Sequence, residues 1–181
     1  RLRHLAFDEG AVLAEHVVVA TNSPTNATAA FHTKQAAYRS YVLAAELPRQ
    51  DGPHALVWDL ADPFHYVRVH PRPGDEADVL LFGGEDHKTG QDEVGAGARF
   101  ARLEAFARRH VPATGRVVDR WSGQIMESMD GLAFIGRVED DRNVYVVTGD
   151  SGNGLTHGAI AAMLLPALIR DGDHPWRALY D

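Results

Sequence analysis

The stretch NVYVVTGDSGNGLTHGAIAAMLL, residues 143–165, carries the most informative pattern of the chain. A β-branched run at residues 144–148 enters a turn with three glycines, and a run of small and apolar residues from 155 to about 170 leaves it. This order predicts a strand, a glycine loop and a helix. Pro166 falls inside the predicted helix, where it removes a backbone hydrogen bond and should bend the helix.

The glycine loop, residues 149–154, is open to two interpretations. Its spacing matches neither the dinucleotide motif GxGxxG nor a Walker loop, which needs a lysine. The first interpretation is an ordinary turn with Ser151 or Asn153 as the helix N-cap. In the second, the free N–H groups of the first helical turn face a ligand with partial negative charge, and the glycines let a flat ligand approach. Neither Thr156 nor His157 adds a negative charge that would cancel this field.

The composition excludes several classes of function. Apolar residues make up 45% of the chain and charged residues 24%, which is typical of soluble globular proteins. The net charge of -7 argues against nucleic-acid binding, which needs a basic face. Without cysteine, the chain can form no disulfide, thiolate zinc site or iron–sulfur cluster of its own. It shows no transmembrane run and no signal peptide, so we expect a cytoplasmic protein, and we interpret it as part of a longer product.

The order of the other elements predicts the fold class. A helix is predicted at residues 97–110, where Phe100, Leu103 and Phe106 form an apolar stripe. Strands are predicted at residues 17–20, 38–47, 55–59, 65–70, 79–82, 117–121 and 132–135. We therefore expect an α+β protein: a mixed, largely antiparallel sheet with helices on one face, flanked by pieces of an α/β domain.

Three stretches together resemble one protein family: HVVVATNSP (residues 16–24), RWSGQIMESMDGLAFIG (120–136) and the stretch at 143–165. In this order they resemble the C-terminal half of flavoproteins of the D-amino-acid oxidase superfamily, which includes glycine, sarcosine and amine oxidases and dehydrogenases. With HTKQAAYRSYV (32–42) and GGEDHKTGQ (83–91), the chain is most similar to a bacterial group of FAD-dependent oxidoreductases often fused to a Rieske iron–sulfur domain.

The resemblance implies a division into three segments. Residues 1–27 would be the late part of an FAD-binding domain, 28–120 the substrate-binding domain, and 121–181 the return to the FAD-binding domain. The N-terminal Rossmann portion with its GxGxxG loop is not in this chain, so we expect weak FAD binding or none by the chain alone. The implied FAD-binding residues are Ala20, Thr21, Asn22, Gly149, Asp150, Ser151, Gly152, Asn153, Gly154, Leu155 and Thr156.

The resemblance also implies an activity. The complete protein would oxidise a C–N bond of an amine or amino-acid-like substrate by hydride transfer to the flavin, and pass electrons to oxygen or to a Rieske partner. The helix start after the glycine loop would stabilise negative charge at the pyrimidine edge of the reduced flavin. We expect the chain alone to be inactive. The alternatives are a non-catalytic binding or assembly module with the same fold, and a phosphate-ligand binder that uses residues 149–154.

One departure from the family concerns the substrate. Relatives that oxidise amino acids often carry Gly-x-Arg-Pro, whose arginine binds the substrate carboxylate; this chain has GQIM at residues 123–126, with Ile125 in place of the arginine. An amine substrate therefore gains support over a simple α-amino acid. We expect the substrate-binding residues to be Tyr66, Arg68, Trp121 and Gln124.

Each of these side chains also has a simpler interpretation. Tyr66 could be an ordinary half-buried strand residue, Arg68 a surface charge, and Trp121 a core residue. His65 and Tyr66 cannot both face a pocket, because successive strand residues point to opposite sides, and we favour Tyr66. The pattern names no catalytic base.

Two further expectations concern a metal and the assembly. The residues 85–87 (Glu-Asp-His) predict a loop at a sheet edge and not a metal site, because no second ligand stands at helical spacing. The strands at 17–20 and 144–148 should expose apolar faces, so we also expect self-association.

Overall fold

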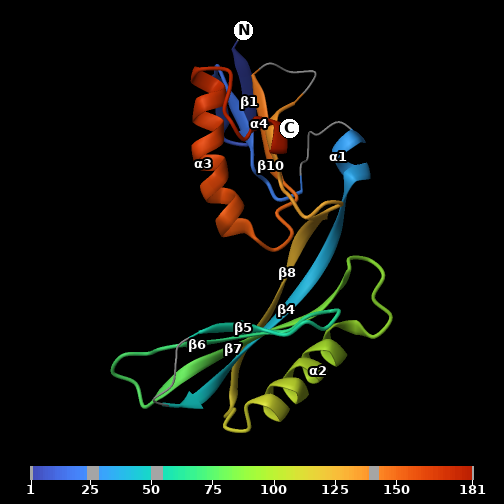
Figure 1. The fold of residues 1–181 in the computed structure, drawn as a ribbon, viewed down its shortest axis with the longest axis vertical. Coiled ribbons are helices and arrows are strands. Elements are labelled where there is room, and N and C mark those ends of the chain that lie inside the picture. Colours follow the sequence, from blue (N-terminus) through green and yellow to red (C-terminus); the bar gives the residue numbers. More distant parts are fainter. Residues whose placement is uncertain (1, 24–28, 50–54, 139–142, 181) are drawn as a thin grey trace. The chain divides into compact units, whose positions relative to one another are not determined.

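The computed structural model describes residues 2–23, 29–49, 55–138 and 143–180 (Figure 1). The chain divides into two compact units. The terminal unit comprises residues 1–36 and 125–181, and the central unit comprises residues 37–124. Two long strands contribute residues to both units: β4 (Gln35–Pro48) and β8 (Val117–Ser128).

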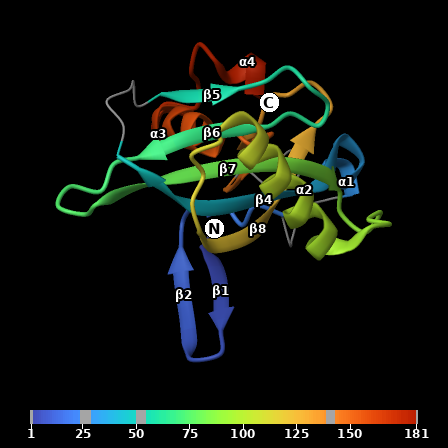
Figure 2. The ribbon, with the colours of Figure 1, turned by 90° about the horizontal axis from the view of Figure 1, so that it is seen from below.

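The central unit is a five-stranded sheet with the order β5-β6-β7-β4-β8 (Figure 2). It adds β5 (Leu56–Trp58), β6 (Tyr66–His70) and β7 (Ala77–Lys88) to the two long strands. The pairs β5–β6, β6–β7 and β7–β4 are antiparallel. Helix α2 (Gly95–His110) packs on one face of this sheet.

The core under α2 is formed by the side chains that point to one face of the sheet. On β4 the core positions are every second residue, so one face of the strand packs on the helix and the other faces away. The predicted stripe of α2 is confirmed, since Leu103 is fully buried and Phe100 and Phe106 pack against the same core. The buried residues of this core are Tyr41, Leu43, Ala45, Leu47, Leu80, Phe82, Leu103 and Ala107.

The prediction of a loop at residues 85–87 is wrong, because β7 continues to Lys88. The register between β4 and β7 shifts near Arg39, where one extra residue of β7 is accommodated as a bulge. The backbone there is left-handed at Gly84 (φ 145°) and Glu85 (φ 57°). The bulge breaks the two-residue alternation, and that alternation was the signal the sequence analysis relied on.

The terminal unit contains a three-stranded sheet with the order β3-β10-β9. Strand β3 (Val17–Val19) is parallel to β10 (Val144–Thr148), and β9 (Phe134–Arg137) is antiparallel to it. Helix α3 (Gly154–Arg170) continues past Pro166 and packs on this sheet. Its core consists of Ala133, Ile135, Tyr145, Ala161, Leu164, Leu165 and Leu168.

Four smaller elements complete the terminal unit, and the sequence analysis predicted none of them. Strands β1 (Arg3–Phe7) and β2 (Gly10–Ala14) form a separate antiparallel hairpin. The short helices are α1 (Ala29–Lys34) and α4 (Arg177–Tyr180). Both are too brief to show a helical period in the sequence.

The fold class is the predicted one: an α+β protein with a largely antiparallel sheet next to a small parallel pairing. The prediction that the strand at 144–148 exposes an apolar face is wrong. Tyr145 and Val146 are each only 3% exposed, because β10 is the central strand of its sheet. The edge strand β3 does expose Val18, at 43%. Within the described residues, no helix is both long enough and apolar enough to cross a membrane.

Candidate functional site

The parallel pairing of β3 and β10 brings two predicted segments to one sheet edge. Val17 pairs with Val144 and Val19 with Val146, so the carboxyl ends of both strands lie side by side. The hydroxyl of Thr148, the last residue of β10, donates a hydrogen bond of 2.5 Å to the carbonyl of Asn22, which follows β3. The exposed segment 20–22 and the glycine loop 149–154 are therefore neighbours. Parallel strands place binding loops at this edge in many α/β proteins.

Both segments turn through left-handed backbone. Asn22 has φ 62° and Gly149 has φ 71°, a region that asparagine and glycine tolerate best. A Cβ at Gly149 would lie 2.9 Å from Gln35 Oε1 and 3.2 Å from Phe134 Cδ2. Glycine is thus required at 149 for its conformation and for the close approach of its neighbours.

Gln35 supports this edge and was missed by the sequence analysis. Its side chain is 8% exposed, and its Oε1 lies 3.2 Å from the Thr148 hydroxyl. The two residues are far apart in the sequence, so no local pattern could reveal the contact. The buried Nε2 of Gln35 has no hydrogen-bond partner in the described part of the chain.

The glycine loop is anchored to the end of β8. Ser151 donates its backbone N–H to the Met126 carbonyl at 3.0 Å, and its hydroxyl accepts the Ser128 N–H at 3.2 Å. Ser151 adopts a left-handed φ of 47°, and Gly152 a φ of 77° with open space where a Cβ would stand. The loop is fixed by backbone contacts while its tip remains uncovered.

The start of α3 is exposed and has no side-chain cap. Asn153 is at the N-cap position, and its side chain makes no capping hydrogen bond. Leu155 is 95% exposed, and Gly154 and Thr156 are also exposed. The helical ladder begins with the His157 N–H, which donates to the Asn153 carbonyl at 3.0 Å. The preceding N–H groups therefore form an accessible, electropositive helix start.

One negative group stands beside this helix start, which the sequence analysis did not anticipate. The Asp150 Oδ2 atom lies 2.6 Å from the position that a Cβ of Gly154 would occupy. A carboxylate there offsets part of the positive field of the first turn. A side chain at 154 would displace this carboxylate.

His157 connects the loop to the rest of the terminal unit. The ring is 5% exposed, its Nε2 accepts the Ala133 N–H at 3.4 Å, and its Nδ1 lies 3.2 Å from the Asp150 carbonyl. Because Nε2 accepts, the single ring proton is on Nδ1 and is donated to that carbonyl. His157 is thus a neutral bridge between the β8–β9 turn and the glycine loop.

In the central unit, Tyr66 and Arg68 lie on β6 and face away from α2. Their neighbours Val67 and Val69 pack in the core under the helix. The His65 ring stacks on Phe106 of α2 with a centroid distance of 3.9 Å. His65 and Tyr66 therefore point to opposite sides of the sheet, as predicted.

The other two predicted substrate residues are not near Tyr66. Trp121 and Gln124 lie on β8, and β7 and β4 separate β8 from β6. At about 4.8 Å per strand, this separation is about 14 Å. The interpretation of Trp121 as a core residue is wrong, because 45% of it is exposed on the edge strand. Ile125 follows on the same strand and is half-buried.

Tyr66 belongs to a polar cluster on its face of the sheet. Its ring covers Gly83 so closely that a Cβ there would lie 1.9 Å from Tyr66 Cζ. The nearby Ser40 hydroxyl lowers the pKa of both Tyr66 and Asp86, against the larger effect of burial. Burial, and to a lesser degree the charge of Asp86, raises the pKa of Tyr66 above 10.0. Burial likewise raises the pKa of Asp86 above 3.8.

A second polar network lies on the α2 face of the sheet. His65 Nδ1 lies 3.1 Å from Asp59 Oδ2, and Arg99 of α2 contacts Asp92 at 2.9 Å and Glu85 at 3.8 Å. A hydrogen bond from the His65 N–H lowers the pKa of Asp59, and a hydrogen bond from Arg99 lowers that of Asp92. These pairs anchor α2. No group of three or more potential metal ligands is found among the described residues.

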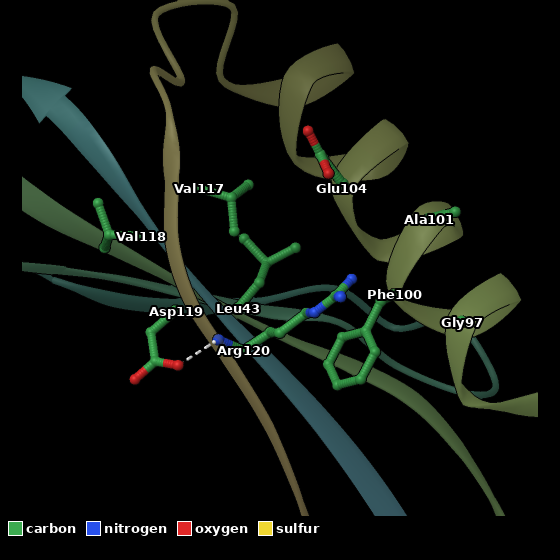
Figure 3. Close-up of a pocket in the computed structure, with 9 residues that line it drawn as sticks. All are labelled: Leu43, Gly97, Phe100, Ala101, Glu104, Val117, Val118, Asp119 and Arg120. Carbon is green, nitrogen blue, oxygen red and sulfur yellow. Dashed lines mark hydrogen bonds between the residues drawn. The ribbon is translucent and has the colours of Figure 1, made fainter.

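A groove of about 500 Å³ lies between α2 and β8 (Figure 3). Its floor is apolar, and the Arg120 guanidinium reaches over the Phe100 ring at 5.5 Å. The carboxylate of Glu104 is bound to Arg108 by two hydrogen bonds. Because Glu104 is paired with Arg108 and Arg120 lies over Phe100, we assign no ligand to this groove.

The geometry of the glycine loop agrees with the family comparison. The DAO family of FAD dependent oxidoreductases matches residues 3–168. This chain belongs to the DAO family. FAD is accordingly the cofactor type of its family.

Three relatives place the chain within the DAO fold. A Rieske-named 2Fe-2S iron-sulfur protein of Bacillus subtilis (strain 168), YhfW, is 29% identical over 143 residues, which cover 78% of this chain and 27% of YhfW. Glycine oxidase from Bacillus cereus ATCC 14579 has a TM-score of 0.70 at 18% identity, covering 92% of this chain and 46% of the oxidase. L-proline dehydrogenase from P. horikoshii has a TM-score of 0.70 at 17% identity, covering 93% and 46%. The chain thus spans less than half the length of these relatives.

The residues at the glycine loop fit a flat DAO cofactor. Gly152 has open space around it, the first turn of α3 is exposed, and its N–H groups have no side-chain cap. A flat heterocycle with developing negative charge suits such a surface.

Proposed function

We propose that this chain is the substrate-binding and flavin-capping portion of an FAD-dependent oxidoreductase that oxidises a C–N bond of an amine or amino-acid-like substrate. The observation that carries the proposal is the exposed, uncapped start of α3 behind the glycine loop. Membership of the DAO family supports it. In this proposal the terminal unit holds one edge of the flavin and the central unit supplies the substrate-binding surface.

The residues proposed to hold the flavin are the predicted ones. The N–H groups of Gly154, Leu155 and Thr156 provide the positive end of α3, and residues 20–22 form the adjoining wall. A bound flavin would supply the acceptor for one hydride, which carries two electrons, from the substrate carbon. The chain orients the ring and stabilises negative charge at its edge through the helix start.

The substrate class we propose is an amine without an obligatory carboxylate. Ile125 is half-buried on β8 and offers no charge to a carboxylate. The Arg39 guanidinium on β4 donates a hydrogen bond to Ser122 Oγ at 2.8 Å. Glycine oxidase and L-proline dehydrogenase share only the fold with this chain, so they do not decide between substrates.

The proposed partners are the remaining part of an FAD-binding domain and a Rieske iron–sulfur domain as electron acceptor. The Rieske-named relative YhfW supports the second partner, since the match covers 27% of its length and leaves room for a further domain. The chain has no cysteine and cannot hold such a cluster itself.

The test uses a longer protein that joins this chain to an FAD-binding domain. We expect a yellow protein whose flavin absorbance bleaches anaerobically with an amine and returns with an oxidant. The chain alone, passed through gel filtration with FAD, should keep no stoichiometric flavin and show no turnover. A longer protein that stays colourless would favour the non-catalytic assembly module instead.

A phosphate-ligand binder that uses residues 149–154 is the second candidate. The exposed helix start favours it, because N-terminal N–H groups suit phosphate oxygens. The Asp150 carboxylate next to Gly154 argues against it, because that charge repels a phosphate dianion. Calorimetry with inorganic phosphate and nucleotides on this chain separates the two candidates.

A further inference from the structure

Gln35 is a polar residue in a buried position at the candidate flavin site. It is the first residue of β4 and belongs to the same compact unit as the glycine loop. Its Oε1 atom lies 2.9 Å from the position that a Cβ of Gly149 would occupy, and 3.2 Å from the Thr148 hydroxyl. The amide of Gln35 therefore lies where β10 ends and the glycine loop begins, on the side towards which a side chain at 149 would point.

The hydrogen bonds of this amide are few for a buried group. The Thr148 hydroxyl has one proton, and two acceptors share it: the Asn22 carbonyl at 2.5 Å and Gln35 Oε1 at 3.2 Å. The Asn22 contact is much the shorter, so Oε1 receives only a weak hydrogen bond. Gln35 Nε2 has no partner at all among the described residues, although Gln35 is only 8% exposed.

The apolar neighbours of Gln35 make this arrangement unfavourable for the fold. Phe134 Cδ2 lies 3.2 Å from the Cβ position of Gly149, and the Phe134 ring contacts the Phe31 ring edge-to-face at 5.5 Å. Aromatic rings do not replace the water that the amide loses on burial. A buried donor without a partner destabilises a fold, so an apolar side chain of similar length would be more stable at position 35. A glutamine in such a place indicates a role other than stability.

The chemistry of the amide suits one part of a flavin. A glutamine side chain presents a donor and an acceptor next to each other. The pyrimidine edge of a flavin carries an imide group, in which a carbonyl oxygen and an N–H stand next to each other in the same way. Two such groups can form a pair of parallel hydrogen bonds, as glutamine does with the edge of adenine. The backbone N–H groups at the start of α3 are donors only, so Gln35 adds an acceptor for the imide N–H.

Nε2 is buried, so the amide has to turn to meet a ring that lies against the glycine loop. The last torsion of a glutamine side chain joins an sp³ carbon to an sp² carbon and has a broad energy minimum. The only hydrogen bond that the turn weakens within the described residues is the shared contact with Thr148. The turn therefore costs less than the two hydrogen bonds that it allows.

We propose that Gln35 is a flavin-recognition residue, whose side-chain amide binds the imide group of the isoalloxazine ring. The inference rests on the proposed function and adds a residue of β4 to the flavin-binding segments at 20–22 and 149–156. It assigns a specific acceptor to the imide N–H of the flavin. It also explains why a buried amide is present at a position where an apolar side chain would be more stable.

The first test is the stability of this chain. Gln35→Met keeps the length of the side chain and fills the same apolar surroundings without an unpaired donor. We expect the urea midpoint of unfolding to be higher for Gln35→Met than for the wild type. A lower midpoint would show that the amide is paired within the chain itself, and would overturn the inference. Gln91→Met changes an exposed glutamine between β7 and α2, and this control should leave the midpoint unchanged.

The second test measures cofactor binding by the longer protein that joins this chain to an FAD-binding domain. The matched probe is 3-methyl-FAD, in which a methyl group replaces the imide proton. We expect the wild type and Gln91→Met to bind FAD about tenfold or more tightly than 3-methyl-FAD, and Gln35→Met to bind the two alike. Gln35→Glu should also weaken FAD binding, because an ionised carboxylate cannot donate to the imide oxygen. Visible absorbance during titration gives each Kd without any turnover.

A wild type that binds FAD and 3-methyl-FAD alike, or a Gln35→Met variant that still separates them, would overturn the inference. In the second case another acceptor, such as the Asp150 carboxylate, binds the imide N–H. The proposed function fails separately. If the longer wild-type protein stays colourless with FAD, the proposed function is wrong and this inference falls with it. If FAD binds with the expected preference but no amine bleaches it, the role of Gln35 stands and the oxidase proposal is wrong.

Discussion

Gly149 shows most directly how one residue fixes the candidate flavin site. Two constraints apply to it: a left-handed φ of 71°, and the approach of Gln35 Oε1 to 2.9 Å from any Cβ. Gly152 has a similar φ of 77° but open space around it. The pair therefore separates backbone strain from steric contact.

We expect Gly149→Ala to lower the free energy of unfolding by about 2–4 kcal/mol, and Gly152→Ala by about 1 kcal/mol. Gly149→Ala is expected to cost more than Gly152→Ala because Gln35 and Phe134 have to move to make room for the methyl group at 149. Urea unfolding of both variants measures it. If the two variants lose equal stability, the close packing around Gly149 is unimportant.

His157 is the second residue on which the site geometry depends. Its ring accepts from the Ala133 N–H and donates to the Asp150 carbonyl in a buried position. We expect His157→Ala to cost about 2–4 kcal/mol, because it leaves a cavity and two unpaired backbone groups. His32→Ala, at an exposed position of α1, is the control and should cost less than about 0.5 kcal/mol. In the wild type, ¹⁵N NMR should show a neutral ring with its proton on Nδ1; a proton on Nε2 would contradict the assigned bridge.

For single residues, the sequence predicted those roles that depend on neighbours in the chain. Gly149 and Gly152 of the predicted glycine loop lie in left-handed turns of the structure. Gln35 and His157 gave no such signal, because their partners are remote in the sequence and only the fold brings them together. Strand alternation predicted that His65 and Tyr66 face opposite sides, and alternation holds wherever the strand is regular.

Among the elements, α2 is bound to the loop before it through a charged contact between Arg99 and Asp92 with a clear pH dependence. The hydrogen bond from Arg99 holds the pKa of Asp92 below its ordinary value of 3.8 in the folded chain. When the pKa of a carboxyl is lower in the folded than in the unfolded chain, its ionised form stabilises the fold at a pH above the unfolded pKa. This stabilisation is lost as the pH falls through the folded pKa.

We therefore expect Asp92→Asn to be less stable than the wild type at neutral pH. The difference between the two should shrink as the pH falls below 3.8. Denaturant unfolding across this range measures it, with Asp119→Asn on the exposed β8 edge as the control. A difference that is constant from neutral to acid pH would show that the charge of Asp92 does not contribute.

The start of α3 gives a prediction that links stability to cofactor chemistry. Asn153→Asp places a carboxylate at an N-cap position that has no side-chain hydrogen bond. We expect the chain to gain about 0.5–1 kcal/mol in stability, because the charge complements the helix dipole. In the longer flavoprotein the same charge should lower the flavin reduction potential by about 10–20 mV, because it opposes negative charge on the reduced ring.

The control for this prediction is Asp173→Asn, which removes an exposed charge after the end of α3. It should change neither the stability of the chain nor the reduction potential of the flavin. A rise in stability with an unchanged potential would show that the helix start does not face the flavin.

The sequence predicted which elements exist better than where they end. The helices α2 and α3 began within two residues of the predicted positions, because their apolar periods are strong. Strands β7 and β8 are longer than predicted: β7 crosses a bulge, and β8 continues from Val117 to Ser128 through polar residues. A bulge or an exposed edge removes the alternation on which strand prediction depends.

For the whole molecule, the α+β class followed from the order of elements, whereas the parallel pairing of β3 with β10 is known from the structure alone. The two units each have a core of their own, built from segments remote in sequence. The segment boundaries at residues 28 and 121 remain predictions. The hairpin β1–β2 was missed because its sequence, rich in Leu, Ala and Val, places apolar residues on both faces and shows no alternation.

That hairpin is the basis of the last prediction, which concerns assembly. Its sheet has only two strands, and it exposes Phe7 (63%) and Val12 (53%) on one face and Leu13 (63%) on the other. A two-stranded sheet with unpaired edges and apolar faces is marginal in water and tends to associate.

We expect this chain to self-associate as its concentration rises, and the double variant Val12→Lys, Leu13→Glu to remain monomeric over the same range. Sedimentation velocity measures both. Leu60→Glu is the control, since Leu60 is 97% exposed but lies outside the strands, and its removal should change nothing. A wild-type chain that stays monomeric throughout would show that the hairpin faces are compatible with water. Loss of association in Leu60→Glu as well would place the contact elsewhere.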